Sequence, residues 1–202
     1  MEIVDLSVPV SENTPVYPGD PKTVIKPAGT FDKDGYNDHL VSIGTHVGTH
    51  IDSPFHMLAD GKKLDDIPIE QFIGRGCYVN AENGFDLAAI KEIDIQKGDI
   101  VLFHTGIVSR YQESSYYEDY PDIPEDVARY LVGKKIKMIG MDMSGPDHPP
   151  HNIHKILLGG GILIIENLTN LDKLAGRNFT VYALPIKLNL DGAPARVIAQ
   201  LD

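Results

Sequence analysis

Hydrophobic residues in this chain fall into short runs that glycine, proline and acidic residues interrupt. Runs rich in apolar and β-branched side chains predict strands, since such side chains fit the pleated surface of a sheet. The predicted strands cover residues 3–9, 23–26, 39–43, 76–80, 100–104, 137–141, 162–165, 179–184 and 196–199. The pattern therefore predicts a chain that consists mainly of short strands.

Helical signals are fewer. Asp86 can cap a helix over residues 87–93, Pro124 stands where a helix ending at Gly133 begins, and Asn152 can cap a helix over residues 153–158. A further short helix is expected near residues 171–174, and residues 29–38 are expected to form an acidic, flexible connection. Many strands with few short helices predict an antiparallel-rich α+β domain rather than a regular βαβ alternation.

Residues 46–56 contain the densest group of chemically active side chains. His46, His50, Asp52 and His56 all occupy even positions, so in an extended chain they project from one face while apolar residues project from the other. A helix would also group the first two histidines, but the glycine and proline within the segment disfavour it. We therefore expect a strand that ends in a turn.

Composition and charge narrow the class of protein. A length of 202 residues suits a single domain covering residues 1–202. The net charge of −11 opposes binding to nucleic acid, and no apolar run approaches the ~18 residues typical of a membrane span. One cysteine, Cys77, and no secretion signal indicate a cytoplasmic protein with a small-molecule substrate as its expected partner.

Imidazole and carboxylate groups in this spacing suit zinc or manganese. Several such groups on one strand face would be costly to bury without a cation or a hydrogen-bond network, although the alternative of ordinary surface or core histidines stays open. Glu166 follows an apolar strand, and His154 lies on the helix before that strand, so the two can form a second cluster. The alternative for Glu166 is a solvent-facing position at the strand end.

The motif His46-x-Gly-Thr-His50-x-Asp52-x-Pro54-x-His56 resembles the signature of the cyclase-type metal-dependent hydrolases, which include bacterial kynurenine formamidase and isatin hydrolase. Weaker similarities lie in residues 14–20, 98–102, 140–142, 154–166 and 193–196. The resemblance implies a barrel-like, swivelling β/β/α core and a homodimer or homotetramer. It also implies hydrolysis of a small-molecule amide C–N bond, with N-formylkynurenine or a similar N-formyl aryl amide as substrate.

The resemblance further implies a role for each side chain. Two divalent ions, zinc or manganese, would be held by His46, His50 and Asp52 at the first position, with Asp52 bridging to a second position formed by His154 and Glu166. His56 would transfer protons. Its ordinary pKa near ~6.5 suits proton exchange with water and a leaving nitrogen at neutral pH.

Two positions depart from the common family pattern. Tyr17 stands where many relatives have tryptophan, and Met57 stands where an aromatic residue is frequent. Tyr17 and His151 are candidate substrate contacts. Two other functions stay open from the sequence: hydrolysis of a cyclic amide or imide of the isatin type, and metal binding without catalysis on the same scaffold.

Overall fold

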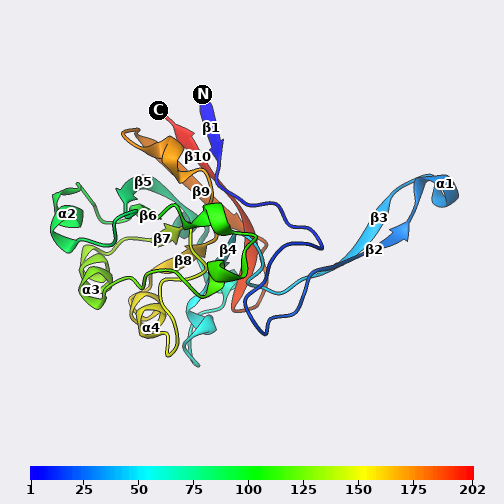
Figure 1. The fold of residues 1–202 in the computed structure, drawn as a ribbon, viewed down its shortest axis with the longest axis horizontal. Coiled ribbons are helices and arrows are strands. Elements are labelled where there is room, and N and C mark those ends of the chain that lie inside the picture. The colour runs from blue at the N-terminus through cyan, green and yellow to red at the C-terminus, as the bar shows by residue number, and fades with distance from the viewer.

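A mixed β-sheet that closes on itself forms the body of the protein (Figure 1). The computed structural model describes residues 1–202. The sheet order is β1-β10-β4-β8-β7-β6-β5-β9, and β9 also pairs with β10, so the seven strands from β10 to β9 form a barrel with β1 outside it. The strands are β1 (Glu2–Asp5), β4 (His50–Asp52), β5 (Ile73–Asn80), β6 (Ile100–His104), β7 (Met138–Met141), β8 (Leu163–Glu166), β9 (Phe179–Pro185) and β10 (Gly192–Leu201).

Antiparallel pairings predominate in this sheet. Five of its eight pairings are antiparallel, and three are parallel. The prediction of an antiparallel-rich, barrel-like α+β fold with few short helices is therefore confirmed.

The expectation that regular βαβ alternation would be absent is wrong for residues 73–166. Strands β5, β6, β7 and β8 run parallel and alternate with α2 (Leu87–Glu92), α3 (Glu125–Lys134) and α4 (Asn152–Gly159). Parallel neighbours need a crossover connection, and here short helices supply it. The sequence predicts all three helices, which have six to ten residues. It does not predict that the strands they connect pair in parallel, because strand pairing depends on the tertiary structure.

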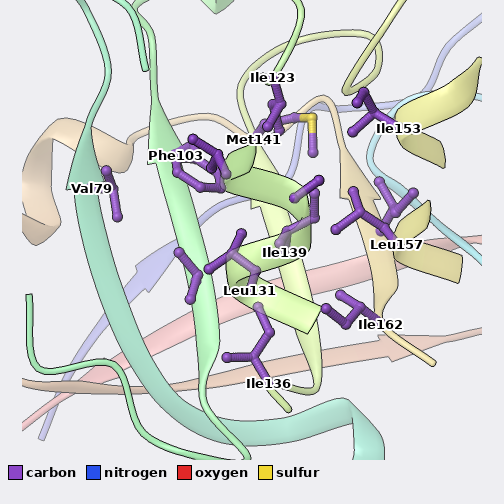
Figure 2. Close-up of a cluster of buried hydrophobic side chains, with 14 of the residues drawn as sticks. Val79, Phe103, Ile123, Leu131, Ile136, Ile139, Met141, Ile153, Leu157 and Ile162 are labelled. Atoms are coloured by element: carbon purple, nitrogen blue, oxygen red, sulfur yellow. The ribbon is translucent and has the colours of Figure 1, made fainter. Parts of the chain in front are cut away.

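Strands β6, β7 and β8 are buried on both faces, which explains their continuous apolar runs. Ile100 and Leu102 of β6 face the barrel interior, while Val101 and Phe103 face the side covered by the helices. Figure 2 shows this second cluster, in which Phe103 and the strand residues beside it meet side chains from α3 and α4. The helices thus cover the outer face of these strands, and β8 among them ends at the buried polar residue Glu166.

Residues 24–42 form a hairpin that projects from the barrel (Figure 1). Strands β2 (Val24–Gly29) and β3 (Asp38–Ser42) pair antiparallel, with α1 (Phe31–Asp34) at the tip. The expected flexible connection over residues 29–38 is therefore wrong. Its polar residues order the tip instead, because Asp34 Oδ2 accepts from the Thr30 N–H at 2.8 Å and Asn37 Oδ1 accepts from the Phe31 N–H at 3.0 Å.

The helix boundaries agree with the sequence at some ends only. Asp86 caps α2 as predicted, since its side chain accepts a hydrogen bond from the Ala88 N–H. Gly133 does not end α3, which continues to Lys134 and stops where Lys135 adopts a left-handed conformation with φ of 58°. No helix in the structure has the length and apolar character needed to cross a membrane.

Candidate functional site

The site lies where β4 pairs with β8 on the outer face of the barrel. His50 of β4 stands opposite Glu166 of β8 in the antiparallel register. Ile51 points into the barrel core, so His50 and Asp52 share the other face, as the even spacing predicts. All three polar residues are buried, with 1% of His50, 1% of Asp52 and 6% of Glu166 exposed.

The strand is shorter than expected, since only residues 50–52 form β4. Gly48 adopts φ of 61°, and the chain before β4 turns there. Pro54 begins a 3-10 turn that covers Pro54–His56. His46 and His56 therefore reach the site through turns on either side of β4, not through the alternation of a strand.

Asp52 and Glu166 form the centre of the cluster, and histidines surround them. His50 Nε2 lies 3.4 Å from Asp52 Oδ1 and 3.3 Å from Glu166 Oε2. His154 Nε2, from α4, lies 3.3 Å from Glu166 Oε1 and 3.9 Å from Asp52 Oδ2. His46 Nδ1 lies 2.8 Å from Asp52 Oδ1. The structure thus brings together five side chains that the sequence singled out, across more than a hundred residues of chain.

Three of these histidines have their second ring nitrogen fixed by an outer acceptor. His50 Nδ1 lies 2.8 Å from the Gly48 carbonyl oxygen, which can only accept, so this nitrogen carries a proton. His154 Nδ1 lies 2.6 Å from Asp147 Oδ1. His46 Nε2 lies 2.7 Å from Asp191 Oδ2. Each ring therefore turns one nitrogen toward Asp52 and Glu166 and anchors the other, as is usual for metal-binding histidines.

His56 differs from the other three histidines. Its nearest carboxylate contact is Asp191 Oδ2, 3.7 Å from Nδ1, which is beyond hydrogen-bond distance. Its ring centroid lies 4.1 Å from that of His46 and 6.0 Å from that of His154. A quarter of its side chain is exposed. His56 therefore faces the cluster without an anchored nitrogen of its own.

The carboxylates stabilise positive charge in this cluster. Burial alone would lower the pKa of His50, but its contacts with Asp52 and Glu166 outweigh burial and raise that pKa to about 10. The same opposition raises the pKa of His154 to about 10, with Asp147 as the largest favourable contact. Burial alone would raise the pKa of both central carboxyls, yet the neighbouring histidines hold the pKa of Asp52 well below its usual range and also lower that of Glu166.

The pKa of His56 shifts the other way. Burial is the largest cause of its lowered pKa, and the positive charge of His46 and His154 adds to it. The Asp52 and Glu166 charges oppose the shift without cancelling it. His56 is thus neutral over a wider pH range than its neighbours, as a residue that accepts a proton must be.

A divalent metal fits these residues. His50 Nε2 and Asp52 Oδ2 are buried and have no hydrogen-bond partner, which is costly for polar atoms unless something else satisfies them. Two trios have ligand atoms within 4.8 Å of one another and share Asp52: one adds His46 and His56, and the other adds His50 and Glu166. Mixed imidazole and carboxylate donors suit zinc and manganese.

A pocket opens onto this cluster. Apolar and aromatic side chains line part of it: Tyr17, Met57, Tyr117 and Tyr120. The polar part includes the site histidines together with Ser144 and His151. The rings of Tyr17 and Tyr117 meet edge to face at 6.0 Å between centroids. Both candidate substrate contacts from the sequence, Tyr17 and His151, therefore line the pocket, and the tyrosine-rich segment 111–120 contributes to its wall.

Sequence reasoning missed three residues of the site. Asp147 lies in a loop rich in proline and glycine, where it accepts from the Ile153 N–H at 2.7 Å and so also caps α4. Asn167 follows Glu166 with φ of 57° and donates to the Gly48 carbonyl at 2.9 Å. Asp191 is followed by Gly192, and in a sequence an Asp-Gly pair indicates a turn and not a functional site. Two signals were usable: Asn167 directly follows Glu166, and Asp147 lies in a loop of residues 144–151 that is rich in polar groups.

Comparisons with known proteins agree with this geometry. The Cyclase family model, described as "putative cyclase", matches residues 4–148. Kynurenine formamidase of Bacillus thuringiensis (strain Al Hakam) is 30% identical over 98% of this chain and 96% of its own length. The corresponding protein of Geobacillus thermodenitrificans is also 30% identical, over 96% of this chain and 94% of its own.

Solved structures show the same relationship. One described as a potential metal-dependent hydrolase with cyclase activity has a TM-score of 0.82 and 31% identity, and the match covers 98% of this chain and 96% of that one. Isatin hydrolase A from Labrenzia aggregata, bound to benzyl benzoate, has a TM-score of 0.88 and 26% identity, with 98% of this chain and 93% of that one covered. The chain belongs to the family of cyclase-type metal-dependent hydrolases.

Proposed function

We propose that this protein is a metal-dependent hydrolase that cleaves the C–N bond of an N-formyl aryl amide such as N-formylkynurenine. The observation that carries the proposal is the buried Asp52 and Glu166 pair, surrounded by histidines, at the base of a pocket with aromatic walls. Support also comes from kynurenine formamidases that match this chain over nearly their whole length.

The ligands proposed for zinc or manganese are His46, His50, Asp52, His154 and Glu166, with two ions per subunit. Bound ions of this kind lower the pKa of water toward neutrality and polarise a carbonyl oxygen. The chain itself contributes the orientation of the donors, since each of the three histidines has an anchored outer nitrogen.

His56 is proposed to move the proton. Its Nδ1 lies on the side of Asp191, which leaves Nε2 as the atom for proton exchange. Its lowered pKa keeps the ring neutral and able to accept a proton near neutral pH, and the ring can then return that proton to the departing nitrogen.

The aromatic side of the pocket is proposed to hold the aryl ring of the substrate. Tyr17 and Tyr117 already meet edge to face, and such aromatic contacts favour another ring placed against them. Tyr120 and Met57 extend this wall. An aryl ring packed there would exclude water from one side of the scissile amide.

We further propose a cytoplasmic homodimer or homotetramer that binds neither nucleic acid nor membranes. The net charge of −11 opposes attraction to phosphate backbones. The single cysteine, Cys77, is free and buried, as is common where no disulfides form. The oligomer itself rests on the family resemblance alone.

The direct test is formate release from N-formylkynurenine by protein loaded with zinc or manganese. The His56→Ala form should lose about 100- to 10,000-fold in kcat, the usual contribution of a positioned acid–base group, and should keep its metal. His39→Ala, which removes an exposed histidine of β3, is the matched control and should retain wild-type turnover. Absence of wild-type turnover on every amide tested would rule out the hydrolase and leave a metal-binding protein without catalysis.

Hydrolysis of a cyclic amide is the second candidate. The observation in its favour is the match to isatin hydrolase A, which has the higher TM-score of the two structures described above. A panel of formanilides and cyclic imides run with each metal separates the two, because only the former release formate. Ring opening at a higher kcat/KM than formate release would favour the cyclic substrate.

A further inference from the structure

Asp191 contacts two histidines of the site, although nothing in the sequence motif includes it. Its Oδ2 atom lies 2.7 Å from His46 Nε2 and 3.7 Å from His56 Nδ1. The Thr45 hydroxyl also donates to Oδ2 at 3.3 Å. Asp191 thus lies on the outer side of His46, while Asp52 lies against the other nitrogen of the same ring.

The backbone around Asp191 is tied to the residue that follows Asp52. The Ser53 N–H and hydroxyl both donate to the Asp191 carbonyl, at 2.8 Å and 2.9 Å. Ser53 is fully buried, so these bonds are shielded from water. The main chain at Asp191 is therefore held at a fixed place relative to β4, and its carboxylate is held by the Thr45 hydroxyl and His46 Nε2.

Gly192 shows that this segment fits the His46 ring closely. A Cβ at Gly192 would lie 3.0 Å from His46 Cε1 and 2.8 Å from the Ile51 carbonyl oxygen. Both approaches are closer than ordinary van der Waals contacts, and the second involves backbone. The Asp-Gly pair thus supplies an acceptor for one edge of the ring and room for the ring itself.

The other two anchored histidines show what this arrangement does. His154 and His50 each direct Nε2 toward the central carboxylates and bind an outer acceptor through Nδ1, Asp147 in one case and the Gly48 carbonyl in the other. His46 follows the same plan with its nitrogens exchanged, since Nδ1 faces Asp52 and Nε2 faces Asp191. An outer acceptor that fixes the ring tautomer is a common support for metal-binding histidines.

We infer that Asp191 is a positioning residue, which keeps the proton of His46 on Nε2 and so leaves Nδ1 free to bind a metal beside Asp52. The inference rests on the proposed function, because it assumes that His46 is a metal ligand. Asp191 acts through His46 and does not itself touch the substrate.

Metal affinity, measured by competition with a chromophoric chelator, tests this without any substrate. Asp191→Ala should weaken zinc or manganese binding about 10- to 100-fold, the usual effect of losing an outer hydrogen-bond partner. Asp191→Asn keeps an oxygen that can accept from Nε2–H and should weaken binding less. Asp60→Ala removes an exposed carboxylate four residues after His56 and should stay within about twofold of wild type. Thermal unfolding of the metal-free forms checks that each variant is folded.

A ring-nitrogen NMR spectrum of the metal-loaded protein gives an independent readout. His46 should carry its proton on Nε2 in the wild type and in Asp191→Asn. Metal affinity of Asp191→Ala within twofold of wild type would overturn the inference, whether or not any amide is hydrolysed. So would complete loss of the metal in Asp191→Asn, because Asp191 would then be a direct ligand. Failure of the hydrolase proposal alone would leave these affinities unchanged.

Discussion

Two buried carboxylates stand at the ends of neighbouring parallel strands, and their surroundings are opposite. Asp142 directly follows β7, and Glu166 is the last residue of β8. Asp142 accepts three hydrogen bonds: from the Thr105 N–H at 2.7 Å, from the Thr105 hydroxyl at 2.8 Å and from the Gly106 N–H at 2.7 Å. Glu166 faces the imidazoles of His50 and His154, at 3.3 Å each.

The difference shows that burial alone does not mark a functional carboxylate. Backbone and hydroxyl donors satisfy the Asp142 carboxylate, and these hydrogen bonds hold the turn that follows β6. Asp52, the partner of Glu166, is just as buried but keeps one oxygen without a partner. A buried carboxylate is suited to bind a cation when one of its oxygens has no hydrogen-bond partner and its neighbours are imidazoles or carboxylates that can also bind a metal.

The largest expected effect comes from removing the carboxylate that both trios share. Asp52→Ala should abolish metal binding and lower kcat/KM by at least about 1,000-fold, because bound metal supplies several kcal/mol of transition-state stabilisation and each 1.36 kcal/mol is a factor of ten. Elemental analysis and formate release measure the two effects. Asp52→Ala protein that still holds a full complement of metal would contradict the distinction between Asp52, which has an oxygen without a partner, and Asp142, which accepts three hydrogen bonds.

The matching change at the satisfied carboxylate should affect stability instead. Asp142→Ala leaves the donors of Thr105 and Gly106 without their acceptor, and each unpaired buried donor costs about 1–3 kcal/mol. We expect the free energy of unfolding of the metal-free protein to fall by about 3 kcal/mol in urea titrations, with metal affinity unchanged. A tenfold or greater loss of affinity in folded Asp142→Ala would make Asp142 part of the site.

A further buried carboxylate, Asp99, sharpens the comparison through the pH dependence of stability. Burial alone would raise its pKa, but the Arg75 guanidinium and the Gln96 N–H hold the pKa below its ordinary value. A carboxyl whose pKa is lower in the folded state contributes stability above its unfolded pKa and loses it as the pH falls through the folded value.

Asp99→Asn should therefore remove part of the acid sensitivity of the protein. The difference in unfolding free energy between wild type and variant should shrink as the pH falls from about 6 to about 2, by at most about 1.4 kcal/mol per pH unit. Urea titrations at several pH values measure this slope. A difference that stays constant over that range would mean that Asp99 does not contribute through its charge.

The sequence predicted more of the strands than of the connections. The apolar runs at residues 100–104 and 162–165 gave β6 and β8 because strands buried on both faces need unbroken apolar sequence. Strands near β2 and β3 were predicted, at residues 23–26 and 39–43, but their pairing and the ordered tip between them were not, since these residues are almost all exposed and carry no core pattern. Pairing between those two strands orders residues that composition alone would assign to a loop.

The site divides in the same way. By itself the sequence determined the candidate metal donors and the shared face of His50 and Asp52, because residue chemistry and the period of a strand are local properties. Only the tertiary structure decided which distant groups meet them: the register of β4 against β8 puts Glu166 opposite His50, and the loop before β10 brings Asp191 to His46. Strand register and loop position depend on packing of the whole barrel, and no local pattern encodes them.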